Sequence, residues 1–88
     1  MKPLPIEFIG RGEVKGYVFR QISATDRAYL YEVRTTNTNV HYEVFKLKIN
    51  KRFDCVSYPT SKAFGVYAWT YMCLGLAKKK FDEINEEG

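Results

Sequence analysis

The stretch from Tyr58 to Leu76 constrains the fold most, because as a helix it is apolar on nearly every side. Pro59 disfavours helix at Tyr58. Ser61, or Thr60, is suited to cap a helix that ends near Glu83–Asn85. Such a helix is too apolar to pack on one small sheet and leave its other side in water. The sequence therefore predicts a second surface that covers it.

On a wheel of about 100° per residue, the predicted helix has two apolar sides. A stripe along its whole length is predicted to face the sheet; it comprises Val66, Thr70, Cys73, Leu74, Ala77, Phe81 and Ile84. A second side is confined to the first three turns and comprises Phe64, Tyr67, Ala68, Tyr71, Met72 and Gly75, while Trp69 and Leu76 fill much of what remains. If a protein partner covers this part of the helix, the predicted interface residues are Phe64, Tyr67, Trp69 and Tyr71.

A contiguous exposed apolar patch is unusual on a monomer, so we expect something to cover the second side. The sequence leaves three possibilities. The N-terminal segment around Leu4, Ile6 and Phe8 could fold back over it. A second copy of the chain could bury it in a homodimer. A different protein could bind it.

Three segments before this helix have the alternation of antiparallel strands, from about 13–23, 28–35 and 40–49, with polar turns at 23–27 and 35–39. The third segment changes phase near Val44-Phe45. Either a bulge or sharp twist keeps both sets of apolar residues on one face, or the strand is buried first on one face and then on the other. Residues 1–12 are predicted to be an N-terminal arm or a short strand.

The element order β-β-β-α predicts one α+β domain over residues 1–88: a three-stranded antiparallel meander packed by one C-terminal helix. An 88-residue chain that is 45% apolar and 16% aromatic is expected to fold as a single small domain. Cys55 and Cys73 lie in no metal-like spacing, so we expect reduced thiols, although one bridge between them stays open. We expect no signal peptide, no membrane segment and a cytoplasmic location.

Residues that could carry catalysis are few. The single histidine, His41, has Glu43 two residues on, which is more typical of a surface ion pair than of acid–base chemistry. One His and two scattered Cys do not make a usual zinc site. The spacing of Gly10, Gly12 and Gly16 does not match a phosphate-binding loop. The sequence therefore predicts no enzyme, no metal and no cofactor.

The net charge of +4 is unevenly distributed, which favours an anionic partner such as DNA or RNA. Residues 1–52 hold ten Lys and Arg against five Asp and Glu, whereas residues 53–88 hold four against five. The predicted phosphate contacts are Arg20, Arg34, Lys46, Lys48, Lys51 and Arg52.

In a sheet covered by one helix the other face would be open, and aromatic residues there could stack on bases. The candidates among the strands are Tyr17, Phe19, Tyr29 and Tyr31. Alternatively, these rings belong to the core under the helix and the charges to a solvated face.

Two resemblances bear on this prediction. The β-β-β-α order with a basic sheet, over residues 13–85, is similar to AP2-type and integrase arm-binding DNA modules, which implies binding through the sheet. The blocks His41-Tyr42-Glu43-Val44-Phe45 and Tyr58-Pro59-x-x-x-x-Phe64-Gly65-x-x-Ala68-Trp69 resemble small proteins of phages and mobile elements of gut bacteria. That resemblance implies DNA-binding, regulatory or host-interference roles.

The sequence thus predicts a small non-catalytic protein that binds nucleic acid through its basic sheet side. The alternative is a protein-interaction module, as a homodimer or a host-directed protein, that uses the apolar first half of the helix.

Overall fold

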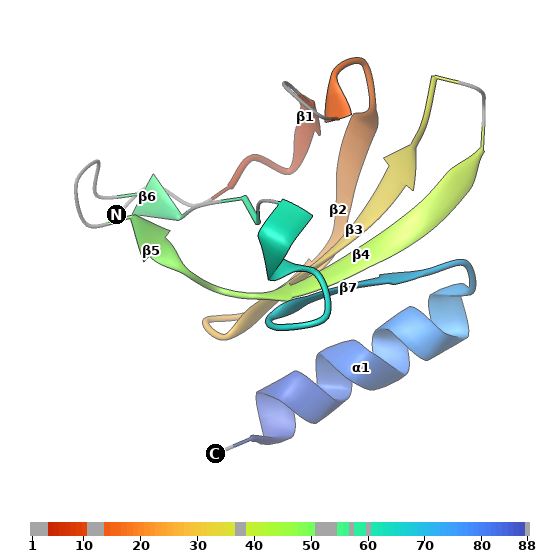
Figure 1. Cartoon of the computed structure of the whole chain (residues 1–88). Helices are drawn as coiled ribbons and strands as arrows, with labels where there is room; N and C mark the ends of the chain where they lie inside the picture. The colour runs from red at the N-terminus through yellow and green to blue at the C-terminus, as the bar shows by residue number, and fades with distance from the viewer. Residues whose placement is uncertain are drawn as a thin grey trace.

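A five-stranded antiparallel sheet in the order β1-β2-β3-β4-β7 organises the chain, with one α-helix on one of its faces (Figure 1). The computed structural model describes residues 4–10, 14–36, 39–50, 55–56, 58–59 and 61–87. The elements are β1 (Glu7–Ile9), β2 (Val18–Ala24), β3 (Ala28–Arg34), β4 (Val40–Lys46), β5 (Ile49–Asn50), β6 (Cys55–Val56), the 3-10 turn η2 (Ser61–Ala63), β7 (Ala68–Tyr71) and α1 (Leu74–Glu86). The α+β class is confirmed. The predicted three-strand meander is the centre of the sheet, β2-β3-β4, and the short N-terminal strand is β1.

The sheet is buried on both faces, and each face has its own core. On one side lies the aromatic core, whose buried members are Phe19, Tyr29, Tyr31, Val33, Phe45, Ala63 and Ala68. On the other side lies the helix core, made of Ala28, Leu30, Val44, Ala77, Phe81 and Ile84. Figure 1 shows α1 along one side of the sheet and η2 on the other.

The central strand β3 contributes to both cores in alternation. Tyr29, Tyr31 and Val33 point into the aromatic core, while Ala28 and Leu30 point into the helix core. All five are almost wholly buried. A sheet with such a strand needs a cover on each face, so a single helix is not enough.

The cover of the aromatic core comes from distant parts of the chain. The ring of Phe8 stacks on that of Phe19, with centroids 4.6 Å apart, and the ring of Tyr58 meets Phe19 edge-on at 5.1 Å. The Tyr31 hydroxyl donates to the carbonyl oxygen of Pro5 at 2.6 Å. The N-terminal segment therefore folds back onto the sheet rather than onto a helix: β1 joins its edge, with Phe8 opposite Phe19, and residues 4–5 lie over the aromatic core.

Helix α1 begins at Leu74, and the part of the predicted apolar stripe that lies within it faces the sheet. Ala77, Phe81 and Ile84, at positions i, i+4 and i+7, are buried in the helix core. The end of the helix is tied to the turn before β3, where the Thr25 hydroxyl donates to Oδ1 of Asn85. The prediction of a C-terminal helix packed on the sheet is confirmed for this part.

The predicted helix over residues 61–73 is wrong. Ser61–Ala63 form a single 3-10 turn, Gly65 has a φ of +89° in the turn that follows, and Ala68–Tyr71 pair with β4 as strand β7. A positive φ suits glycine and ends helical geometry. The aromatic and β-branched residues that follow favour a strand.

The apolar excess of this segment arises because β7, like β3, contributes apolar residues to both cores. Ala68 is buried in the aromatic core, whereas Trp69 and Tyr71 pack against the helix core. Val66 and Thr70, predicted to face the sheet from a helix, are exposed. A strand with apolar residues on both sides lacks the alternation that identifies a strand, and a helical wheel therefore misreads it.

The phase change in the third predicted strand has the same origin. β4 pairs with β3 in continuous register from Val40 to Lys46, so there is no bulge at Val44-Phe45. Val44 belongs to the helix core and Phe45 to the aromatic core. Both sets of apolar residues are buried because both faces are covered.

Gly10 offers a test of how tightly the N-terminal segment packs. A Cβ at this position would lie 2.4 Å from the carbonyl oxygen of Val14 and 2.9 Å from Cε1 of Phe19. We therefore expect Gly10→Ala to lower the free energy of unfolding by about 2 kcal/mol or more, because the segment must shift off the aromatic core. Urea denaturation measures this change.

Gly75→Ala is the matched control. Its Cβ would meet only Sγ of Cys73, at 3.7 Å, among the described atoms within contact range. Because alanine favours helix over glycine, this variant should gain up to about 1 kcal/mol. Equal destabilisation of the two variants would contradict the packing of residues 4–10 described above.

Candidate functional site

Arg20 and Arg34, two of the predicted phosphate contacts, are each held by a carboxylate. Nε of Arg20 lies 3.4 Å from Oε2 of Glu7, and Nε of Arg34 lies 3.1 Å from Oε1 of Glu32. The register places Arg20 directly opposite both Glu7 and Glu32. This corner of the sheet therefore carries as many negative as positive side chains.

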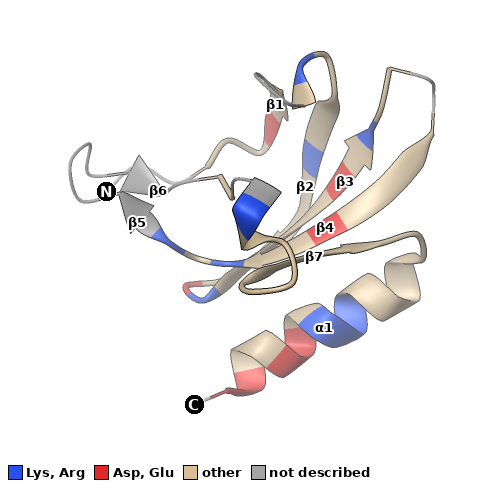
Figure 2. Cartoon of the chain, in the orientation of Figure 1, with Lys and Arg blue, Asp and Glu red and all other residues tan. Residues whose placement is uncertain are grey.

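Lys46 ends β4 and Lys48 follows it, and Tyr67 connects this end of the strand to the turn η2, which holds Lys62. The backbone N–H of Lys46 donates to the carbonyl oxygen of Tyr67 at 2.8 Å, and Nζ of Lys48 lies 5.0 Å from the centre of the Tyr67 ring. The N–H of Tyr67 donates to the carbonyl oxygen of Ala63 at 3.0 Å, next to Lys62. Figure 2 shows lysines on η2 and at the end of β4 near the same end of the sheet, with η2 on the face opposite α1.

We call Lys46, Lys48 and Lys62 the basic end. Lys48 and Lys62 are exposed, and Nζ of Lys46 is 3.0 Å from Oε2 of Glu87 just beyond α1. Lys62 was missed by sequence reasoning, because its neighbours were assigned to a helix and a single lysine gives no signal of its own. The hairpin β5–β6 follows directly after Lys48. Lys51 and Arg52 lie between its two strands in the sequence but outside the described residues.

The aromatic residues predicted to stack on bases are not available for that role. Tyr29 and Tyr31 are buried in the aromatic core with Phe19. The Tyr31 hydroxyl also accepts a hydrogen bond from Gln21 at 3.2 Å, and burial raises its pKa to about 12. Tyr17 is half-buried against the same core. The sheet face opposite the helix, predicted to be open, is filled by the aromatic core, and the alternative in which these rings face the helix is also wrong.

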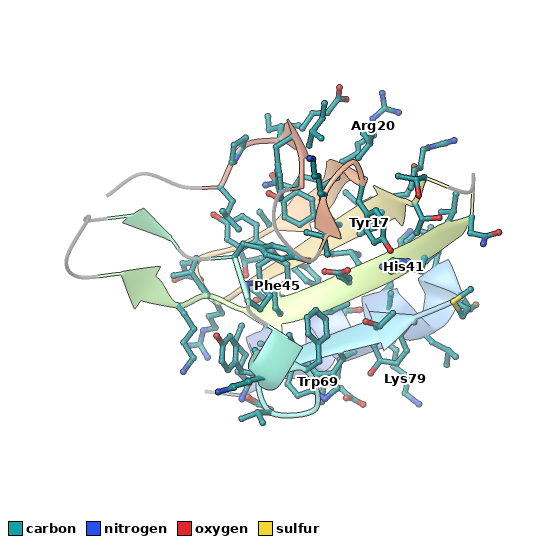
Figure 3. All side chains as sticks on the ribbon, turned by 45° about the horizontal axis from the view of Figure 1, so that its top comes forward. Tyr17, Arg20, His41, Phe45, Trp69 and Lys79 are labelled. Atoms are coloured by element: carbon teal, nitrogen blue, oxygen red, sulfur yellow. The ribbon has the colours of Figure 1, made fainter. Side chains whose placement is uncertain are left out.

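The four predicted interface residues do not form one surface. Phe64 and Tyr67 pack against the aromatic core, whereas Trp69 and Tyr71 pack against the helix core on the opposite side of the sheet. Nζ of Lys80 from α1 lies 4.1 Å from the centre of the Trp69 ring. Figure 3 shows Trp69 on the lower strand of the sheet, well away from Tyr17 and Arg20.

His41 and Glu43 form a buried network rather than a surface ion pair. Glu43 is only 4% exposed, and its two oxygens are occupied by Nε2 of His41 at 2.9 Å and by the hydroxyl of Tyr58. Burial, and then the nearby carboxylate of Glu43, raise the pKa of Tyr58 well above its usual range. The network links β4 to the segment that covers the aromatic core, so its evident role is structural.

Two other features bear on possible chemistry: the exposed thiol of Cys73 and a groove in the surface. Hydrogen bonding from the backbone N–H groups of Leu76 and Gly75 lowers the pKa of the exposed Cys73 thiol. A groove of about 840 Å³ runs along residues 4–10 and Tyr58, and Lys15 is the one charged residue among the described residues that line it. A groove with so few converging polar groups does not resemble a catalytic cleft.

The described residues bring together no group of three His, Cys, Asp or Glu side chains that could hold a metal ion. No helix in the described part of the chain has the length and apolar character needed to cross a membrane. Comparisons with protein-family models, with curated proteins and with solved structures found no match for this chain. The resemblances to DNA-binding modules and to phage-encoded proteins therefore stay predictions.

The Glu43 network predicts that replacing glutamate by leucine lowers the free energy of unfolding more at Glu43 than at Glu32. Glu43→Leu should lower the free energy of unfolding by about 2–4 kcal/mol, since it leaves the partly buried hydroxyl of Tyr58 and ring nitrogen of His41 without their acceptor. Glu32→Leu removes only a surface ion pair with Arg34 and should change the free energy by less than about 1 kcal/mol. Thermal or urea unfolding distinguishes them, and a small effect at Glu43 would refute a structural role for the network.

Proposed function

We propose that this chain is a small non-catalytic nucleic-acid-binding protein that holds the phosphate backbone with its basic end. The observation that carries this proposal is that Tyr67 connects the end of β4 to η2: Nζ of Lys48 lies over its ring, the backbone of Lys46 bonds to its carbonyl, and its own N–H bonds to Ala63, next to Lys62. Lysines that are distant in the sequence thus lie at one end of the sheet, and together they make that end positive. Phosphates are the anions that such a surface favours when the cations do not form a closed pocket.

The carboxylate that pairs with Lys46 can be displaced by a phosphate. Glu87 pairs with Lys46, and its backbone carbonyl oxygen accepts a hydrogen bond from Nη1 of Arg27. A surface ion pair of this kind contributes at most about 1 kcal/mol. A phosphate can therefore displace the Glu87 carboxylate from Lys46 at little cost.

Arg20 and Arg34 are left out of the proposed site for two reasons. Each has a carboxylate close to its guanidinium group. Arg34 is also paired with Val40 at the start of β4, six residues before Lys46 at its end. At about 3.3 Å per residue, this separation is roughly 20 Å, so the two sets cannot contact the same phosphate.

Binding of this type is expected to be sequence-independent. Lysines contact phosphates as point charges, and they release counterions rather than read base edges. Since Phe19, Tyr29 and Tyr31 are buried, the described structure offers no platform of stacked rings. We therefore expect moderate affinity that falls steeply as salt rises.

Fluorescence anisotropy with a labelled DNA duplex of arbitrary sequence tests this proposal. The double variant Lys48→Glu/Lys62→Glu should bind at least about tenfold more weakly at low salt. The slope of log K against log salt should also become shallower by about 0.9 for each phosphate that the variant no longer neutralises. Both side chains are exposed, so the fold should be unaffected.

The matched control is Lys78→Glu/Lys79→Glu, which makes the same change of charge on the exposed side of α1. It should bind within about twofold of the unchanged chain if the basic end is the site. Equal weakening in both double variants would show that only net charge matters. Absence of salt-dependent binding by the unchanged chain would contradict the proposed function itself.

A further inference from the structure

One corner of the sheet on the helix side is not covered by α1. The helix packs on β3, β4 and β7, while β1 and β2 lie at the other edge of the sheet (Figure 1). Because Phe8, Phe19 and Val33 point into the aromatic core, their neighbours in each strand point to the helix side. We call this surface the open face; its residues are Glu7, Ile9, Val18, Arg20, Glu32 and Arg34.

The open face exposes apolar side chains where a monomer would normally have polar ones. Ile9 is 66% exposed and Val18 is 36% exposed, and the register places them directly opposite each other on β1 and β2. Neither belongs to the aromatic core or the helix core as the structure describes them. Adjacent exposed apolar residues on a sheet mark an interaction surface.

The charges around these residues alternate in sign across the strands. Glu7, Arg20 and Glu32 lie side by side on β1, β2 and β3, and Arg34 follows two residues after Glu32 on the same face. With Val18, these four side chains line a shallow hollow of about 250 Å³. The four charges cancel, so this face does not favour a nucleic acid or any partner of one sign.

We propose that the open face is the contact surface of a homodimer, with two copies packed face to face about a two-fold axis. The surface that complements an alternating pattern is itself alternating, and the same face on a second copy has that pattern. In a two-fold interface the same patch contributes from both sides. An offset of one strand, about 4.8 Å, brings Arg20 of each copy over Glu7 of the other and Ile9 over Val18, with Glu32 and Arg34 at the margin of the contact.

The interface is small, which sets the expected affinity. Two strands and part of a third contribute side chains, so the buried area is at the low end for specific contacts. We expect a dissociation constant between about 10 µM and 1 mM. This inference uses residues that the proposed nucleic-acid site does not use, so either can fail without the other.

Sedimentation equilibrium over a wide concentration range tests the dimer. The 10.3 kDa chain should approach twice its mass as concentration rises. Ile9→Asp should weaken association at least tenfold, since it places a charge in the apolar part of the contact. Val66→Asp is the control, because Val66 is similarly exposed, at 70%, but lies in the turn before β7. A monomer at every concentration, or equal effects of the two variants, would overturn the proposal.

A charge-inverted variant tests whether the pattern selects the partner. Glu7→Arg/Arg20→Glu/Glu32→Arg/Arg34→Glu retains the pairs within each copy and should self-associate like the unchanged chain. Mixed with the unchanged chain, it should form hetero-dimers at least tenfold less often than either homodimer in native mass spectrometry, because like charges then meet. Mixed dimers at the statistical proportion would contradict the proposed charge complementarity.

Discussion

The burial of β3 on both faces is the constraint on which the rest of the structure depends. Its alternate residues fill two cores, so each side of the sheet must be covered by the chain itself. The described residues of this 88-residue chain form one long helix, and α1 covers the helix core. The aromatic core is closed by the edge strand β1 and by residues outside regular strands and helices, among them Leu4 and Tyr58. Aromatic rings suit this task, since a few of them exclude water over a wide area.

The burial of the sheet on both faces also limits which side chains are exposed and can bind a partner. The tyrosines that would have been attractive for stacking on bases are used to fill the aromatic core, and their hydroxyls are bonded to backbone groups such as those of Leu4 and Pro5. Charged side chains are left at the margins of the sheet. They form two distinct surfaces, the basic end around Tyr67 and the neutral open face around Arg20. We propose that the first contacts nucleic acid and that the second contacts a second copy of the chain.

Sequence periodicity predicted the elements that have one polar side or a regular alternation. The three central strands and the stripe of Ala77, Phe81 and Ile84 on α1 follow from such patterns. Strand β7 could not be found this way, because it contributes apolar residues to both cores and an apolar run has no period to distinguish strand from helix. The basic end was predicted only in part, since the contact of Lys48 with Tyr67 depends on β7 lying beside β4. The Glu43–Tyr58 bond likewise joins residues that only the fold brings together.

The most direct test of this account is a nuclear Overhauser spectrum of the folded chain. If the N-terminal segment covers the aromatic core and β7 completes the sheet, ring protons of Phe8 should show strong contacts with Phe19. Backbone protons of Thr70 should likewise contact those of Glu43 across the β4–β7 pair. Sequential helical contacts through residues 64–73, with no contact between Phe8 and Phe19, would contradict the two-sided sheet. The positions of the basic end and of the open face would then also be wrong.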